Sequence, residues 1–355
     1  MNILEIITEA LRLGASDIFL IAGSPVEIKV RNQLMRLNDT KLNPSLTETL
    51  INEIYHTAHR PLREGILADG DDDFSFSVNT LARFRVNVYR QRGSLAAVLR
   101  IVRFSIPKPE DLHIPVSIVD FAGIRKGLVI ISGPAGSGKS STVATIIDRI
   151  NQTRASHIVT IEDPIEYLHA HARSIVSQRE IGTDCATTAS ALKAALRQAP
   201  DVLFVGEMRD LDTIALAITA AETGHLVFST LHTLGAANTV DRIIDVFPAA
   251  QQQQIRVQLS MVLQAVISQQ LVNDKEGRLL PVFEVMTNTP AVRNLIREGK
   301  THQLNNAITS SVNEGMIAMD GMLEKLVKEH VISSSEALNH AFDPVILRKR
   351  LDETV

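Results

Sequence analysis

The feature that most constrains this chain is a glycine-rich stretch between an apolar run and a helical pattern. Residues 133–140 read Gly-Pro-Ala-Gly-Ser-Gly-Lys-Ser, and residues 129–132 before them read Val-Ile-Ile-Ser. A short buried strand, this loop and a helix over 142–150 form the context of a phosphate-binding loop. Glycine lets backbone N–H groups turn inward around phosphates without Cβ clashes, and the helix N-terminus adds its dipole. The sequence therefore predicts a binding site for a nucleoside triphosphate.

The side chains at the end of this loop have distinct expected roles. The Lys139 ammonium would reach the β- and γ-phosphates, and the Ser140 hydroxyl would ligate Mg²⁺. The residues expected to bind the nucleotide are Gly133, Pro134, Ala135, Gly136, Ser137, Gly138, Lys139, Ser140 and Ser141. A glycine-rich turn that matches by chance is disfavoured, because strand, loop, lysine, hydroxyl and helix are all in register.

Composition narrows the class of protein. The 355 residues suit two domains, and 45% hydrophobic and 21% charged residues are typical of a soluble globular protein. The single cysteine, Cys185, excludes a disulfide framework and a tetracysteine zinc site on this chain.

No stretch reaches the roughly 18 apolar residues that span a bilayer, and the amphipathic start resembles neither a signal nor a transit peptide. We expect a cytoplasmic protein, and the net charge of −4 weakly disfavours nucleic-acid wrapping.

Residues 1–104 predict an α+β module with helices on an antiparallel sheet. The alternation over 83–89 indicates a half-buried strand with basic residues on one face, in a hairpin with 95–102. The other expected elements are helices at 3–13 and 46–54, strand-like runs at 18–21, 26–30 and 34–37, and a strand at 74–78. The acidic run 69–73 is expected in a solvated turn. Three prolines mark residues 105–119 as a linker.

Residues 120–355 predict a parallel α/β sheet, because apolar strand-like runs alternate with helical patterns. The expected strands are 128–132, 157–161, 202–206 and 226–230, and the expected helices are 139–151, 187–198, 210–221 and 236–244. From about residue 250 the pattern is largely helical, with one strand-like segment at 279–286.

Acidic side chains follow two of these strands, where a parallel sheet places its ligands. The strand at 157–161 leads into Glu162-Asp163-Pro164-Ile165-Glu166. A carboxylate here could orient or deprotonate a water in line with the γ-phosphate, or could cap the next helix. The strand at 202–206 is followed by Glu207, and an apolar run before an acid fits a Walker B motif that holds Mg²⁺ or its waters.

Two histidines, His225 and His232, bracket the expected strand at 226–230. A single histidine beside an apolar strand is usually a satisfied polar group. Here two histidines flank the strand that follows the Walker B pattern. This position favours a role for them as a sensor of the γ-phosphate.

Four segments resemble the Walker A, Asp box, Walker B and His box of the type II/IV secretion ATPase superfamily. They are residues 133–140, 160–167, 205–210 and 220–233. Within the superfamily the chain is most similar to type IV pilus retraction ATPases. Residues 291–298 resemble the C-terminal signature of that subfamily, with Val292 where isoleucine is usual. Extension and secretion ATPases commonly carry a tetracysteine zinc module, which this chain cannot build.

The resemblance implies a PAS-like N-terminal domain over 1–104, a RecA-like ATPase domain over 120–355 with C-terminal helices from about 250, and a homohexameric ring. It implies ATP between the two domains, Glu166 as the general base, Glu207 supporting Mg²⁺, and His225 and His232 coupling the γ-phosphate site to the domain interface. Arg83, Arg85 and Arg100 lie where the family's arginines close onto the nucleotide, although a solvated basic sheet face would look the same. An arginine there would neutralise charge on the transferring phosphoryl group.

The resemblance also implies a partner and a place in the cell. The ring would act on an inner-membrane pilus platform protein, from the cytoplasmic face of the membrane at the pilus base. Membrane contact would be through that protein only, with no nucleic acid or zinc bound. One departure is Phe19, which stands where the family usually has histidine.

Three alternatives stay open at this point. The chain could be a pilus assembly or type II secretion ATPase that lacks the zinc module. It could be a RecA-like nucleic-acid translocase, although 4% aromatic content and an acidic balance disfavour one. It could also be a non-catalytic partner of another ATPase, which the set of Lys139, Ser140, Glu166 and Glu207 argues against.

Overall fold

The computed structural model describes residues 1–30, 33–61, 70–78, 81–102 and 106–352. The chain divides into two compact units, the first comprising residues 1–105 with 166–168 and the second 106–165 with 169–355. Within the described ranges, no helix is long and apolar enough to cross a membrane.

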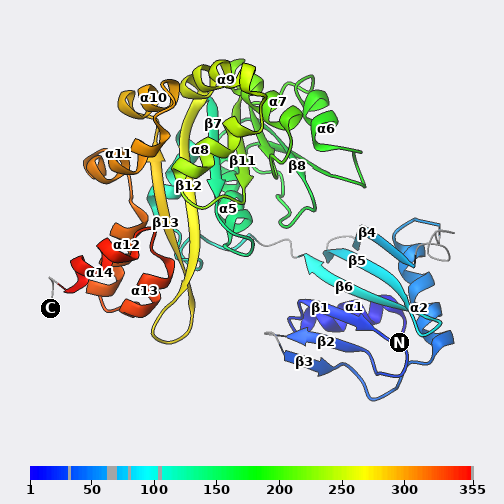
Figure 1. Cartoon of the computed structure of the whole chain (residues 1–355). Coiled ribbons are helices and arrows are strands. Elements are labelled where there is room, and N and C mark those ends of the chain that lie inside the picture. Colours follow the sequence, from blue (N-terminus) through cyan, green and yellow to red (C-terminus); the bar gives the residue numbers. More distant parts are fainter. Residues whose placement is uncertain (31–32, 62–69, 79–80, 103–105, 353–355) are drawn as a thin grey trace. The chain divides into compact units, whose positions relative to one another are not determined.

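The first unit is a six-stranded sheet in the order β3-β2-β1-β6-β5-β4, with antiparallel neighbours (Figure 1). Its elements are α1 (Ile3–Arg12), β1 (Asp17–Leu20), β2 (Glu27–Val30), β3 (Gln33–Arg36), α2 (Pro44–Thr57), β4 (Asp71–Val78), β5 (Ala82–Gln91) and β6 (Ser94–Val102). Helix α1 begins with a capping box, in which Asn2 and Glu5 satisfy each other's backbone N–H groups. The apolar faces of α1, α2 and the sheet form one hydrophobic core.

One expectation for this unit is wrong. The acidic residues Asp71, Asp72 and Asp73 do not form a solvated turn but begin β4, while Asp69 lies outside the described residues. Strand alternation turns Asp72 inward, where it is 2% exposed and accepts a hydrogen bond of 2.8 Å from the Tyr55 hydroxyl. A buried partner therefore keeps this carboxylate in the sheet.

The second unit is built on a seven-stranded sheet in the order β13-β12-β7-β11-β10-β8-β9. All neighbours are parallel except β12 and β13, which form an antiparallel hairpin. The strands are β7 (Gly127–Ser132), β8 (His157–Glu162), β9 (Ile175–Glu180), β10 (Val202–Val205), β11 (Leu226–Leu231), β12 (Leu263–Asn273) and β13 (Leu279–Thr287). The four strands expected at 128–132, 157–161, 202–206 and 226–230 are confirmed within about one residue.

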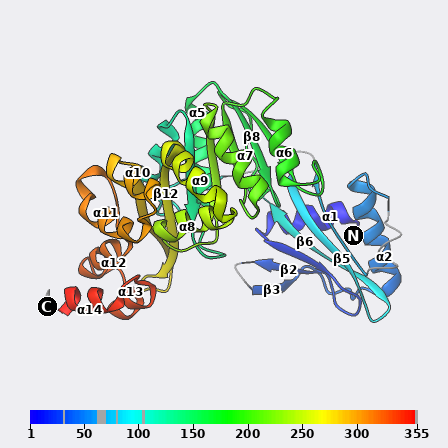
Figure 2. The ribbon, with the colours of Figure 1, turned by 45° about the horizontal axis from the view of Figure 1, so that its top comes forward.

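Helices cover both faces of this sheet (Figures 1 and 2). They are α4 (Val116–Val119), α5 (Lys139–Thr153), α6 (Thr188–Ala195), α7 (Leu211–Glu222), α8 (Ala236–Asp245), α9 (Ala249–Val262), α10 (Pro290–Arg297), α11 (Leu304–Ser310), α12 (Met319–Lys328), α13 (Ser334–His340) and α14 (Pro344–Asp352). Leu128 and Ile130 of β7 belong to the core under α6 to α11, and Val129 and Ile131 to the core under α5. Burial on both faces explains the unbroken apolar runs of these strands.

Two expectations for the second unit are corrected. The segment after residue 250 is largely helical and has a strand at 279–287, as expected, but it also contains a second strand, β12, which was not expected and lies beside β7. Residues 106–119 do not stand apart as a linker, since Ile114 and Ile118 are buried in the core beneath α5. Helices α12, α13 and α14 form a further small core with the end of the β12–β13 hairpin.

Candidate active site

The glycine-rich loop connects the carboxyl end of β7 to the first turn of α5. Gly133 has φ 144°, and a Cβ there would lie 2.1 Å from the Gln269 carbonyl oxygen of β12. Gly138 is the left-handed N-cap of α5, with φ 86°. Any larger residue at Gly133 would push β12 away, so this glycine is required by packing as well as by conformation.

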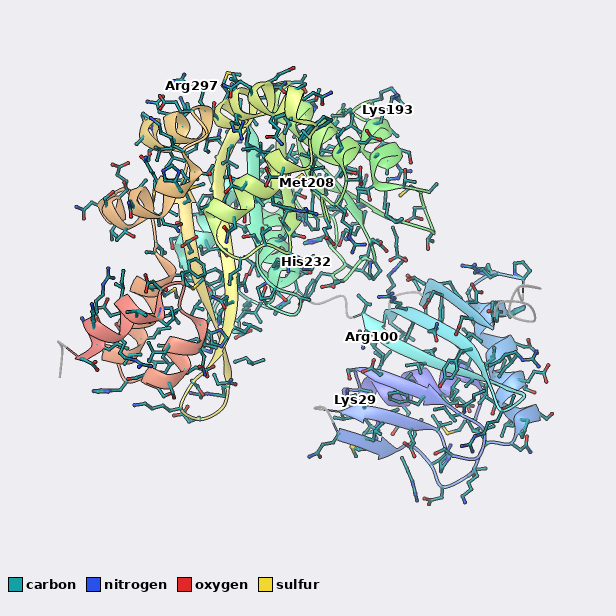
Figure 3. The ribbon with its side chains drawn as sticks, in the orientation of Figure 1. Lys29, Arg100, Lys193, Met208, His232 and Arg297 are labelled. Atoms are coloured by element: carbon teal, nitrogen blue, oxygen red, sulfur yellow. The ribbon has the colours of Figure 1, made fainter. Side chains whose placement is uncertain are left out.

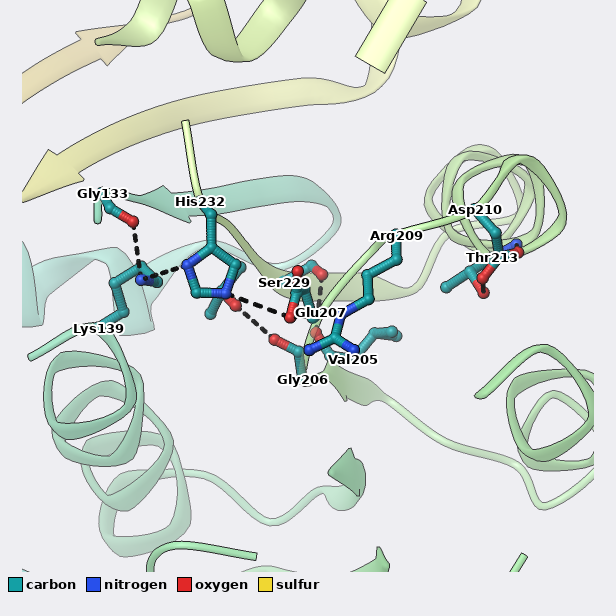
Figure 4. A network of polar contacts seen from close by, with 11 residues as sticks. Gly133, Lys139, Val205, Gly206, Glu207, Arg209, Asp210, Thr213, Ser229 and His232 are labelled. Carbon is teal, nitrogen blue, oxygen red and sulfur yellow. Dashed lines mark hydrogen bonds and ion pairs between the residues drawn. The ribbon is translucent and has the colours of Figure 1, made fainter. Parts of the chain in front are cut away.

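Lys139 points back into this loop. Its Nζ donates to the carbonyl oxygens of Gly133 and Pro134, both at 2.8 Å, and lies 3.4 Å from His232 Nδ1 (Figure 4). The side chain is only 8% exposed. Pro134, Ala135 and Gly136 at the loop's tip are exposed, whereas Ser137 is buried and Ser140 and Ser141 are partly exposed. The ammonium is thus held at the centre of a loop whose tip faces solvent.

A second contact from β12 fixes the start of α5. The buried Thr142 hydroxyl donates to Gln269 Oε1 at 2.7 Å. Gln269 therefore touches the loop with its backbone and the helix with its side chain. This residue was not predicted as part of the site, because its segment was expected to be helical.

Glu207 lies two residues beyond β10, where the Walker B pattern placed it. Its Oε2 lies 2.8 Å from Arg209 Nε and 3.3 Å from His232 Nε2. Thr230 at the end of β11 donates to the carbonyl oxygen of Gly206, which fixes the backbone beside this carboxylate. The ends of β10 and β11 are thereby joined at the site (Figure 4).

His232, labelled in Figure 3, follows β11 and connects the two motifs. The Lys139 ammonium can only donate, so His232 Nδ1 accepts from it. When the ring carries a single proton, that proton is therefore on Nε2 and is donated to Glu207. The result is a chain of polar contacts from Lys139 through His232 to Glu207.

The two predicted histidines are not together. The carbonyl oxygen of His225 accepts from Gly127 at the start of β7, whereas Leu231, next to His232, pairs with the end of β7. Seven residues of extended chain place the two rings at opposite ends of β11, roughly 20 Å apart. The expectation that both serve the same γ-phosphate is wrong within one chain. His225 Nδ1 instead contacts the Ala220 carbonyl oxygen at 2.9 Å, near the C-terminus of α7.

The two acids of the Asp box differ in their surroundings. Glu162 ends β8 and is buried, and its Oε1 accepts from the Thr160 hydroxyl at 2.7 Å and from Gln178 Nε2 at 3.1 Å. Glu166 is exposed in the loop that follows. The Glu162 carboxylate is thus held by two donors, and the role of Glu166 as general base stays a prediction.

The three arginines share one face of the first unit's sheet. Arg83 and Arg85 alternate along β5, and Arg85 lies directly opposite Arg100 of β6. Arg100, labelled in Figure 3, donates from Nε to Asp17 Oδ1 at 3.0 Å. The predicted basic face is confirmed, and contact of these arginines with a nucleotide stays a prediction.

The site fits a magnesium ion shared with a nucleotide. Over the described ranges, no group of three or more His, Cys, Asp or Glu side chains could hold a metal ion. Mg²⁺ needs no such cage, because it is commonly held by one or two protein oxygens together with substrate phosphates. The Ser140 hydroxyl and the Glu207 carboxylate are oxygen donors of this kind.

Known proteins resemble this chain in sequence and fold. Residues 2–279 match the family described as type II/IV secretion system protein. The chain is 43% identical to the type IV pilus retraction ATPase PilT of Pseudomonas aeruginosa, covering 97% of this chain and 99% of that protein. It is 43% identical to a twitching motility protein of Neisseria gonorrhoeae, covering 88% and 83%. A crystal structure of the pilus retraction motor PilT with bound ADP is 45% identical, covers 98% of this chain and 99% of its own, and gives a TM-score of 0.89. This chain belongs to the type II/IV secretion system protein family.

Proposed function

We propose that this chain is an ATPase whose hydrolysis of ATP drives retraction of type IV pili. The observation that carries the proposal is the chain of contacts from Lys139 of the P-loop through His232 to Glu207. It joins the groups that would hold the phosphates to the carboxylate that would support Mg²⁺. Relatives named as pilus retraction and twitching motility proteins, at 43% identity over most of both chains, supply the link to pili.

Each predicted residue except His225 has a role in this proposal. Lys139 and the loop from Gly133 to Ser141 bind the phosphates, and Ser140 and Glu207 hold Mg²⁺, partly through water. Bound Mg²⁺ would neutralise charge on the β- and γ-phosphates. Glu166 would accept the proton of the attacking water, and His232 would connect the phosphate site to Glu207. Arg83, Arg85 and Arg100 would stabilise the transferring phosphoryl group, an effect worth roughly 10³–10⁵ in rate where such contacts are complete.

The motor would be a homohexamer in which ATP binds between the N-terminal domain and the RecA-like domain. ATP and ADP would have different affinities for closed and open subunits, and this difference would drive the movement. The ring would act on an inner-membrane platform protein at the cytoplasmic face of the membrane. Sequential closure would return pilus subunits to the membrane.

The first test is the ATPase rate with the mass in solution, for the wild type, Lys139→Ala and Glu166→Gln. We expect a hexamer whose hydrolysis is unaffected by single-stranded DNA. Lys139→Ala should lose nucleotide binding or turnover, and Glu166→Gln should bind ATP without hydrolysing it. Normal hydrolysis by Glu166→Gln would contradict its role as general base. A steep rise with DNA would favour a nucleic-acid translocase.

The second test is genetic. A piliated strain that lacks the gene should become hyperpiliated if the protein retracts pili. Bald cells would instead identify an assembly ATPase. Complementation with Lys139→Ala is the control, because it supplies the folded protein without turnover.

A further inference from the structure

The N-terminus of α8 is capped by side chains from two neighbouring strands. Ser268 of β12 and Glu284 of β13 lie directly opposite each other, and both are buried. The Ser268 hydroxyl accepts from Gly235 N–H at 2.9 Å, and Glu284 Oε1 accepts from Ala236 N–H at 2.7 Å. A buried carboxylate at a helix N-terminus is favoured by the dipole and satisfies an otherwise unpaired donor.

This cap lies four residues beyond His232. The intervening loop, residues 232–235, has little freedom, because the Thr233 hydroxyl contacts that of Thr239 at 2.8 Å and the latter also bonds the Gly235 carbonyl oxygen. One end of the loop is fixed by β11 and the other by Ser268 and Glu284. The position of the His232 ring between the P-loop and the Walker B strand therefore depends on these two caps.

The same carboxylate contacts the C-terminal helices. Glu284 also accepts from the backbone N–H of Met319, the first residue of α12. Asp320, next in that turn, accepts from Phe342 N–H at 2.7 Å. The Phe342 ring lies 3.2 Å from where a Cβ on Gly235 would be, which brings the C-terminal segment back to the His232 loop.

We propose that Glu284 is a positioning residue of the ATPase site. Its carboxylate holds the N-terminus of α8, and through it His232, in place against Lys139 and Glu207, and joins this loop to the first turn of α12. The inference rests on the proposed ATPase function. Burial raises the pKa of Glu284 to about 7, because its two backbone donors only partly oppose the rise and no cation partner is present in the described contacts.

A double-mutant cycle tests the proposal, with the full chain as Glu284→Gln, His232→Ala and both together. Glutamine keeps the shape but replaces one of the two oxygens with an NH2 group, which cannot accept a hydrogen bond. We expect Glu284→Gln to lower kcat roughly 10- to 100-fold through displacement of the ring. KM for ATP should stay within about twofold, because the P-loop is fixed separately by Gln269. In the His232→Ala background, Glu284→Gln should have little further effect on kcat.

Asp72→Asn is the matched control, since it also converts a buried carboxylate to an amide, but in the first unit. It should leave kcat unchanged. If the Glu284→Gln and His232→Ala effects multiply, or if Glu284→Gln keeps the wild-type kcat, the positioning role is refuted. If Glu284→Gln does not fold, Ser268→Ala removes the neighbouring cap with a smaller change and should show the same dependence on His232.

Hydrogen–deuterium exchange separates this inference from the function on which it rests. Amides of residues 233–240 should exchange faster in Glu284→Gln than in the wild type or Asp72→Asn. A wild-type chain that hydrolyses no ATP would refute the proposed function while this measurement still reports on the cap. Unchanged exchange over 233–240 would refute the cap's role even in an active enzyme.

Discussion

The replacement Glu284→Gln should change how the stability of the protein depends on pH. The Glu284 carboxyl is 3% exposed, and burial, aided by repulsion from Asp320, raises its pKa from 4.5 to about 7. Two backbone hydrogen bonds oppose this rise without cancelling it. Between these pH values the folded protein holds a proton that the unfolded chain has released. This group's contribution is therefore fully present below pH 4.5 and is lost as the pH rises through about 7.

The size of this pH effect on stability follows from the shift of the Glu284 pKa. The rise of the Glu284 pKa from 4.5 to about 7 is worth about 3 kcal/mol over the full range, and most of it falls between pH 5 and pH 8. Glutamine cannot titrate, so the variant lacks this loss. The free energy of unfolding of Glu284→Gln, relative to the wild type, should therefore increase by about 2–3 kcal/mol from pH 5 to pH 8.

Urea unfolding at several pH values measures this difference. The chain has no tryptophan, so far-UV circular dichroism is the suitable signal. Both proteins must be compared at the same concentration, because assembly would stabilise the folded state. Parallel curves for the two proteins would show that Glu284 titrates alike in the folded and unfolded chains. That result would refute the argument from burial.

Three other variants test separate contacts. Gly133→Ala should abolish ADP binding in a calorimetric titration, because its Cβ would lie 2.1 Å from the Gln269 carbonyl oxygen; an unchanged Kd would contradict this. Tyr55→Phe should lower the free energy of unfolding by about 1–3 kcal/mol, because it removes the buried donor to Asp72, and a change below 0.5 kcal/mol would count against it. Burial lowers the pKa of His169 to about 4, so its contribution is present above pH 6.5 and is lost as the pH falls through about 4. His169→Asn should remove this dependence, which is opposite in sign to that of Glu284, and unfolding curves at pH 4.5 and 7 would detect its absence.

The parallel strands were predictable because they are buried on both faces. Each reads as a short apolar run, and the glycine-rich loop fixes where the first of them ends. The same reasoning failed for β12, whose sequence over 263–273 mixes apolar residues with glutamines. Gln269 and Gln270 are buried in polar contacts that only the folded structure supplies, so no periodicity in the chain revealed them.

The candidate site, like the fold, was predictable only in part. Lys139 and Glu207 stand at fixed distances from recognisable strands, and the structure brings them together through His232. The separation of the two histidines was implied by the strand expected between them, because only the residue at the carboxyl end of a parallel strand reaches the site. Gln269 and Glu284 were missed since their role comes from pairing between strands, which a single sequence does not encode locally.

Three consecutive polar residues of β12 connect the candidate site to the C-terminal part of the protein. Ser268 reaches the start of α8, Gln269 the P-loop, and Gln270 exchanges hydrogen bonds with His340 at the end of α13. The family match stops at residue 279, the first residue of β13, long before His340. The family model thus ends inside the folded unit, whereas the similarity to the Pseudomonas aeruginosa relative extends over 97% of this chain. The strand beside the P-loop is also the strand that holds the C-terminal helices, so the part of the chain beyond the family model is attached directly to the candidate site.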